Sequence, residues 1–297
     1  MKTLVTGCSG LVGHALVEHL FKKGHSLQCL QRNRGSSGQQ IWATAALPAS
    51  SAGAFDAVVH LAGENVADGR WTAAKKERIL RSRVEGTAQL VDYIATLEEK
   101  PKVALCASAV GYYGSSMEAI FNEDSPLGKG FLADVCRQWE KEASRLAAMG
   151  IRTVNLRFGM VLSPRGGALW KMVPAFKAGM GGVVGSGEQF VSWISIRDLV
   201  EIVDFVIRQP HIKGPVNVVS PIPTTNRILS TTLGRVLNRP VLMKIPAFMV
   251  RMIFGDMADE MLLASTRVTP KVLLEADYPY QDQSLESVLR YCLDSGA

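Results

Sequence analysis

Short apolar runs alternate with longer amphipathic stretches through the first half of the chain. Such short runs are typical of strands that are buried on both faces of a parallel sheet. They occupy residues 3–6, 27–30, 56–63, 103–108 and 151–162. Apolar residues at helical spacing predict a helix that begins at residue 11 and helices over residues 71–97 and 131–149. The alternation predicts an α/β fold with a doubly wound parallel sheet and helices on both faces.

The pattern changes after residue 162. Glycine-rich loops are expected at residues 163–167 and 179–187, and residues 35–53 are irregular around one short strand near Ile41. The further elements that we expect are helices over residues 197–207 and 226–237, the second capped by Asn226, a strand over residues 215–219 and two or three short helices. Residues 1–162 should form the sheet domain, to which later segments add. Residues 163–297 should form a smaller mixed lobe over the carboxyl ends of the strands, where open α/β sheets bind ligands.

The N-terminus carries the most specific local signal. A strand runs directly into Gly7, Gly10 and Gly13, and an amphipathic helix follows. In a dinucleotide site the first glycine permits a tight turn, the second lets the backbone approach the pyrophosphate, and the third lets the helix pack on the strand. The helix N-terminus then offers N–H groups to phosphate. We therefore predict a Rossmann-type dinucleotide domain, with an ordinary strand-to-helix turn as the alternative.

The end of the second strand indicates which dinucleotide binds. An NAD site usually places Asp or Glu there for the ribose 2′-hydroxyl, but this chain has no carboxylate between Glu18 and Asp56. It has Arg32 and Arg34, and a guanidinium suits a 2′-phosphate. We therefore expect NADP(H), with Arg32 as the ligand because it is nearer the strand. The alternative is that both arginines are merely solvated.

Composition narrows the classes of partner. The 297 residues carry a net charge of +6 without a run of five like charges, which argues against a dedicated nucleic-acid binder. No apolar run reaches the length of a membrane span, and Lys2 leads into the first strand without a signal peptide. We expect a cytoplasmic protein that acts on a small molecule, with neither nucleic acid nor a membrane as partner.

The cysteines and histidines show no spacing typical of metal ligands, and we predict no metal site. Five cysteines are an odd number, and they are widely scattered along the chain. This usage is typical of reduced thiols in a cytoplasmic protein. The cysteines expected to be reduced are Cys8, Cys29, Cys106, Cys136 and Cys292.

Four motifs make the chain resemble the extended short-chain dehydrogenase/reductases. Residues 6–13 read T-G-x-x-G-x-x-G, and residues 60–63 match the motif that lies along the cofactor ribose. Residues 108–114 resemble the S-S-A-x-x-Y-G stretch of sugar-nucleotide epimerases, and residues 157–159 occupy the place that faces the nicotinamide. The expected cofactor contacts are Gly7, Ser9, Gly10, Leu11, Val12, Gly13, Gln31, Arg32, Leu61, Ala62, Gly63, Arg83 and Phe158.

A narrower resemblance covers nearly the whole chain. Its ordered motifs are His60-Leu-Ala-Gly-Glu-Asn65, Arg70-Trp71, Ser82-Arg83, Trp139-Glu140, Arg157-Phe-Gly-Met-Val-Leu162, Gly166-Gly167, Gly185-Ser-Gly-Glu-Gln189, Trp193-Ile194 and Phe254-Gly-Asp-Met-Ala258. Together they look like the atypical family of nucleoside-diphosphate-sugar epimerases that carries a C-terminal domain of unknown function. The chain departs from that pattern at Ser195, Arg197 and Asp277, which concerns the substrate lobe and leaves the expected fold unchanged.

The catalytic Tyr and Lys of the superfamily are missing. In that superfamily a Y-x-x-x-K pair moves a proton to or from the substrate oxygen, and a Ser orients the carbonyl. When the helix is aligned on Glu140, Leu132 takes the Tyr position and Cys136 the Lys position. Leucine has no proton to give, and a neutral thiol adds no positive charge. Ser108 is the member of the triad that is retained and is our candidate catalytic residue; a serine bonded to nearby backbone is the alternative.

Several further side chains could serve either the site or the fold. Tyr112 and Tyr113 could donate a proton from a phenol or pack as aromatic residues, and Cys136 could be a nucleophile or a buried thiol. Glu64 and Asn65 could contact a ligand or cap the next segment, and Arg83 could contact a ligand or form an ion pair with Glu77 or Glu85. Trp193 and Gln189 could lie over the cofactor or in the core.

Two functions fit these residues. The first is an NADP(H)-dependent oxidoreductase or epimerase that acts on a small polar or nucleotide-sugar-like substrate with a non-standard proton relay. The second is a non-catalytic NADP(H)-binding protein that senses the redox state of the cofactor or presents a surface to a partner. A structural homodimer through the two long helices is a third reading, because fold alone does not decide function.

Overall fold

A seven-stranded sheet in the order β12-β7-β5-β4-β1-β2-β3 forms the centre of the molecule. The computed structural model describes residues 1–34, 40–44 and 54–294, and the side chains of residues 1–30 and 54–294. Every neighbouring pair is parallel except β2 and β3, which are antiparallel. The strands are β1 (Lys2–Thr6), β2 (Ser26–Arg34), β3 (Gln40–Thr44), β4 (Ala57–His60), β5 (Val103–Ala109), β7 (Arg152–Phe158) and β12 (Gly214–Val218). The predicted doubly wound α/β fold is confirmed.

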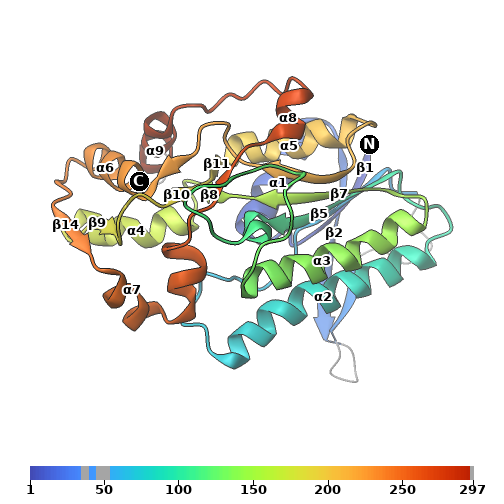
Figure 1. Ribbon diagram of the computed structural model, residues 1–297. Helices are drawn as coiled ribbons and strands as arrows, with labels where there is room; N and C mark the ends of the chain where they lie inside the picture. The colour runs from blue at the N-terminus through green and yellow to red at the C-terminus, as the bar shows by residue number, and fades with distance from the viewer. Residues whose placement is uncertain (35–39, 45–53, 295–297) are drawn as a thin grey trace.

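Helices cover both faces of this sheet (Figure 1). The helices α1 (Leu11–Lys22) and α5 (Ile196–Arg208) pack on one face, and α2 (Ala73–Thr96) and α3 (Phe131–Ala148) lie side by side on the other. Successive strand residues point to opposite faces, so Val5 packs in the core under α1 and Leu4 in the core under α2. This two-sided burial explains why the strands read as continuous apolar runs.

Most of the remaining elements form a lobe of short strands and helices beside the sheet, whereas α8 packs against the sheet near α5 (Figure 1). The strands of the lobe pair as β8 with β11, β9 with β14, β10 with β13 and β6 with β15. These remaining elements are β6 (Ile120–Phe121), β8 (Met160–Leu162), β9 (Gly182–Val184), β10 (Phe190–Val191), β11 (Trp193–Ser195), β13 (Thr224–Thr225), β14 (Met243–Ile245), β15 (Arg267–Val268), α4 (Ala168–Lys177), α6 (Asn226–Val236), α7 (Ala247–Phe254), α8 (Lys271–Glu275) and α9 (Leu285–Asp294), with the short helices η2 (Val110–Tyr113) and η3 (Ala258–Leu262). None of the helices in the described part of the chain combines the length and the apolar character needed to cross a bilayer.

Two details differ from the sequence-based expectations. The strand expected over residues 151–162 is divided into β7 and β8 at Gly159, where a Cβ would lie 2.6 Å from the Ser192 carbonyl oxygen. The cap of α6 is Thr225, whose side chain accepts a hydrogen bond from the Ile228 N–H. Asn226 is instead the first helical residue, and its Oδ1 accepts a hydrogen bond from the Val184 N–H at 2.8 Å. From beyond residue 162, β12 joins the sheet and α5 packs on it.

Candidate cofactor site and active site

The glycine loop between β1 and α1 is closely packed at two of its three glycines. Gly7 has a φ of +75°, and a Cβ there would lie 2.9 Å from the Ala62 nitrogen. A Cβ on Gly13 would lie 2.0 Å from the Gly7 carbonyl oxygen. A Cβ on Gly10 would meet one atom, the same oxygen, at 3.3 Å, and Gly10 is exposed. The fold therefore requires Gly7 and Gly13, whereas Gly10 leaves its outer side open to a ligand.

The N-terminus of α1 is suited to an anion. Gly10 is its N-cap, no side chain caps it, and its first turn contains no acidic residue. The first N–H groups of a helix lack partners within the helix and carry partial positive charge. Ser9 is exposed, and Leu11 and Val12 are half-buried beside it. These residues can hold a pyrophosphate group through backbone N–H groups.

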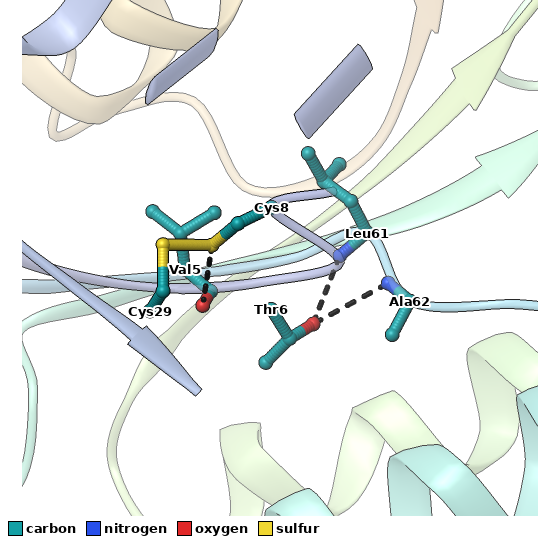
Figure 2. The surroundings of a disulfide bond; sticks show 6 residues. All are labelled: Val5, Thr6, Cys8, Cys29, Leu61 and Ala62. Carbon is teal, nitrogen blue, oxygen red and sulfur yellow. Dashed lines mark hydrogen bonds between the residues drawn. A yellow bond between two sulfur atoms is a disulfide. The ribbon is translucent and has the colours of Figure 1, made fainter. Parts of the chain in front are cut away.

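A buried polar network fixes the loop after β4 beside the glycine loop. Figure 2 shows the Thr6 hydroxyl accepting hydrogen bonds from the Leu61 and Ala62 N–H groups, at 3.2 and 3.3 Å. The same oxygen lies 2.7 Å from His60 Nδ1, and His60 Nε2 lies 3.1 Å from the Thr87 hydroxyl. Thr6 belongs to the predicted T-G-x-x-G-x-x-G motif and His60 to the predicted motif at residues 60–63, whereas Thr87 was not predicted from the sequence. Thr87 is a polar residue at a buried position of α2.

A disulfide bond joins the glycine loop to β2. Cys8 and Cys29 are bonded, with Cα atoms 6.2 Å apart, and Cys8 Sγ lies 3.3 Å from the Val5 carbonyl oxygen (Figure 2). The prediction of five reduced thiols is wrong for this pair. The number and spacing of the cysteines did not indicate this bond, because the parallel register of β1 and β2 brings the two residues together by setting Val5 opposite Cys29. Cys106, Cys136 and Cys292 are free and buried.

The arginine expected to select NADP(H) lies at the far end of the same strand. The backbone of β2 runs through Gln31 and Arg32 to Arg34, and Arg32 is opposite Trp42 of β3. The side chains of Gln31, Arg32 and Arg34 lie outside the described residues. Their role at the ribose 2′-phosphate therefore stays a prediction.

Arg83 lies directly beneath the loop that is expected to follow the cofactor ribose. A Cβ on Gly63 would lie 3.4 Å from the guanidinium carbon of Arg83. Arg83 Nη1 donates to the Glu64 carbonyl at 3.1 Å, and the guanidinium lies over the Trp139 ring. The acidic residues considered as its ion-pair partners, Glu77 and Glu85, both pair with Arg81. Arg83 is thus positioned at the edge of the candidate cofactor site.

The carboxyl ends of β5 and β7 share a chain of buried polar groups. Ser108, at 2% exposure, donates to Glu140 Oε1 at 2.6 Å, and Arg157 binds both carboxylate oxygens of Glu140 at 2.8 Å. Arg157 Nη1 also donates to the Tyr113 hydroxyl at 2.8 Å, and that hydroxyl donates to Asn217 Oδ1 at 2.7 Å. Burial raises the pKa of Tyr113 to about 12. Tyr113 is therefore a neutral member of a fully bonded network.

The first turns of α3 lack the usual proton donor. Leu132 packs against the loop after β5, where a Cβ on Gly111 would lie 3.1 Å from its own Cβ. Cys136 is 2% exposed, and burial raises the pKa of its thiol to about 11. A neutral buried thiol is a poor nucleophile, so the structure favours the packing alternative for Cys136. Tyr112 is half-buried, with its ring against the Arg157 guanidinium at 3.5 Å.

Four other residues that were candidates for ligand contacts make hydrogen bonds or ion pairs within the protein. Glu64 pairs with Lys75 at 2.8 Å, and Asn65 Oδ1 accepts from the Ala67 N–H. Trp193 is buried and donates from Nε1 to the Ile222 carbonyl oxygen. The remaining one, Gln189, is also buried and donates to the Val184 carbonyl oxygen. Trp193 is therefore a core residue, and Asn65 caps the turn that follows it.

One mixed cluster in the described part of the chain has the composition of metal ligands. Single ligand atoms of His19, Glu201 and Asp204 lie within 4.8 Å of one another, between α1 and α5. Lys23 lies 3.4 Å from Glu201, and Arg208 lies 2.5 Å from Asp204. Two cations therefore already neutralise the two carboxylates, and ion pairing accounts for the cluster.

Comparison with known proteins identifies the family. Residues 3–219 match the model of the NAD dependent epimerase/dehydratase family, which covers more than half of the chain. The chain belongs to this family. Residues 245–292 match a domain of unknown function, DUF1731. The resemblance drawn from the ordered motifs is thereby confirmed, together with its C-terminal domain.

Individual relatives extend over the whole chain. The epimerase family protein Mb2239 of Mycobacterium bovis is 37% identical and matches 97% of this chain and 96% of its own. The chloroplastic SDR39U1 homolog of Arabidopsis thaliana is 34% identical, and the match covers 98% of this chain and 86% of the homolog. The crystal structure of human SDR39U1 (isoform2) with NADPH matches 99% of each chain with a TM-score of 0.88 at 33% identity. Since one relative is chloroplastic by name, a cytoplasmic location stays a prediction for this chain.

Proposed function

We propose that this protein is an NADP(H)-dependent oxidoreductase or epimerase that acts on a small polar or nucleotide-sugar-like substrate. The observation that carries the proposal is the glycine loop, with Gly7 and Gly13 packed against backbone and Gly10 open before an uncapped helix N-terminus. Family membership supports an NAD-type cofactor, and the NADPH in the human relative's structure supports the phosphorylated form.

The cofactor would lie across the carboxyl ends of β1, β2 and β4. Its pyrophosphate would meet the N–H groups of α1, its ribose the loop at residues 61–63 above Arg83, and its 2′-phosphate Arg32. Phe158 ends β7 and is half-buried, and the family resemblance implies that it would border the nicotinamide. NADP(H), when bound, supplies or accepts a hydride.

Ser108 is the group that we propose to contact the substrate oxygen. Its hydrogen is already directed to Glu140, so its oxygen retains lone pairs that can accept a hydrogen bond from a substrate hydroxyl. Glu140 is held on both oxygens by Arg157, which fixes the position of Ser108. Proton movement would then follow Ser108 and Glu140 instead of a tyrosine on α3.

The proposal is tested by pairing binding with hydride transfer. Arg32→Ala should weaken NADPH binding by roughly tenfold or more, because a charge-assisted contact to phosphate is lost, and should leave NADH binding nearly unchanged. Ser108→Ala should lower single-turnover hydride transfer more than it weakens NADPH binding, and Cys136→Ala should retain most activity. A Cys136→Ala variant that binds NADPH but transfers no hydride would reverse the assignment of the proton path.

A non-catalytic NADP(H)-binding protein is the second candidate. The observation in its favour is the pair of apolar or neutral groups, Leu132 and Cys136, at the positions of the usual tyrosine and lysine. NADPH that stays reduced with every member of a panel of sugar nucleotides, aldehydes and ketones would favour this candidate. Its surface would then be the functional part, and a homodimer through α2 and α3 is the interface that we propose to examine.

A further inference from the structure

The five cysteines of the chain divide into an accessible pair and a buried set. Cys8 and Cys29 are both partly exposed and are bonded to each other. The buried set, at 2% exposure or less, is Cys106, Cys136 and Cys292. Thiol chemistry requires access of the reagent to the sulfur. The exposure of these residues therefore favours reaction at the pair over the other three.

The disulfide joins the two segments from which the candidate cofactor site is built. Cys8 stands inside the glycine loop, directly after Gly7. Cys29 stands on β2, in the same strand as Arg32. The bond therefore links the segment expected to hold the pyrophosphate to the strand expected to hold the 2′-phosphate, across 21 residues of sequence.

The loop transmits a displacement of Cys8 directly to α1. A Cβ on Gly13 would lie 2.9 Å from the Cys8 Cα and 2.0 Å from the Gly7 carbonyl oxygen, so helix and loop are in close contact. The Gly10 N–H also donates to the Gly7 carbonyl at 3.0 Å. A tether on Cys8 thus restrains the loop in which the helix N–H groups are presented.

We propose that Cys8 and Cys29 form a reversible redox modification site, and that the disulfide form binds NADP(H) more tightly than the dithiol form. The affinity difference rests on the proposed function. A covalent tether orders the loop before the ligand arrives, so binding no longer bears the full entropic cost of ordering it. Reduction removes the tether and leaves two thiols beside the loop.

The chemistry is thiol–disulfide exchange with a low-molecular-weight disulfide. One cysteine thiolate attacks oxidised glutathione, forms a mixed disulfide and releases one glutathione. The second cysteine thiolate then attacks the protein sulfur of that mixed disulfide and releases the second glutathione. In sum, two protein thiols are oxidised, one molecule of oxidised glutathione is reduced to two of glutathione, and the reverse reaction with a dithiol restores the thiols.

The test compares the full chain after reduction by dithiothreitol and after oxidation by oxidised glutathione, each reagent being removed. Maleimide labelling of the folded protein, followed by mass spectrometry and peptide mapping, should modify Cys8 and Cys29 in the reduced form and neither in the oxidised form. Calorimetric titration should show NADPH binding about fivefold tighter in the oxidised form. The difference should vanish in Cys29→Ser and in Cys8→Ser, and persist in Cys292→Ala.

Equal or weaker NADPH binding by the oxidised form would overturn the affinity claim. Cys8 and Cys29 that stay reactive after glutathione treatment would overturn the redox site itself. If neither form binds NADPH, the proposed function fails, and the labelling pattern alone decides whether the redox site exists. Circular dichroism and thermal unfolding of both serine variants establish that a lost difference does not come from a lost fold.

Discussion

Two glycines of one loop are needed for different physical reasons. The space for a Gly13 side chain is filled by the backbone of Gly7 and Cys8, whereas the space outside Gly10 is open. The motif predicts a ligand role for Gly10 and a packing role for Gly13, and the space around the two residues differs in the same sense. The two substitutions should therefore have different phenotypes.

Gly10→Val should preserve the fold and abolish dinucleotide binding, because its side chain would occupy the path of the pyrophosphate. Gly13→Val should lower the free energy of unfolding by about 1–3 kcal/mol or more, since it overpacks the turn. Thermal unfolding and NADPH titration of both variants check this. A Gly10→Val variant with the affinity of the parent would show that the phosphate loop is placed incorrectly.

Glu140 forms an ion pair with the buried Arg157 guanidinium and accepts a hydrogen bond from the Ser108 hydroxyl. Glu140→Ala should lower the free energy of unfolding by about 3–5 kcal/mol, because it leaves a guanidinium buried without its carboxylate. Glu142→Ala is the matched control on the same helix. It removes an exposed ion pair with Arg145 and should cost less than about 1 kcal/mol. Urea unfolding curves compare the two, and equal losses would contradict the role of Glu140.

At the scale of elements, α3 depends on the C-terminal part of the chain. Its N-cap is Gly130, which offers no side chain, and the first N–H groups of the helix need acceptors. Glu260, from η3, supplies them: Oε1 accepts from the Phe131 N–H at 2.9 Å and Oε2 from the Leu132 N–H at 3.1 Å. Glu260 lies 128 residues after Leu132 in the sequence, so no pattern near the start of α3 indicates this cap. It ties the region of the DUF1731 match to the helix that borders the candidate active site.

Glu260→Ala should lower the free energy of unfolding by about 1–2 kcal/mol, because a charged cap at a helix N-terminus is lost. Asp259→Ala is its control, since that neighbouring carboxylate pairs with Arg251 on the surface and should contribute less than about 1 kcal/mol. Thermal or urea unfolding measures both. A Glu260 variant no less stable than the Asp259 variant would contradict the capping role.

At the scale of the whole molecule, the strands and helices of the central sheet could be predicted because each follows from a local pattern of apolar residues. Residues 3–6 and 103–108 are buried on both faces, so each reads as a strand without knowledge of its neighbours. The lobe was less predictable because its strands have two or three residues and pair across long stretches of sequence, as β6 does with β15.

The candidate site divides in the same way. The glycine loop and the loop at residues 60–63 are each a short continuous segment, and both were predicted from the sequence. The Cys8–Cys29 bond and the network of Ser108, Glu140 and Arg157 join separate elements. Such contacts depend on strand register and helix position, which a single sequence does not specify.

The central claim is that the glycine loop and β2 form an NADP(H) site. The most direct test is calorimetric titration of the parent protein with NADPH and with NADH under the same conditions. NADPH should bind at one site per chain, roughly tenfold or more tighter than NADH, because one charge-assisted phosphate contact separates the two ligands. Tighter binding of NADH, or the absence of binding by both, would contradict the account.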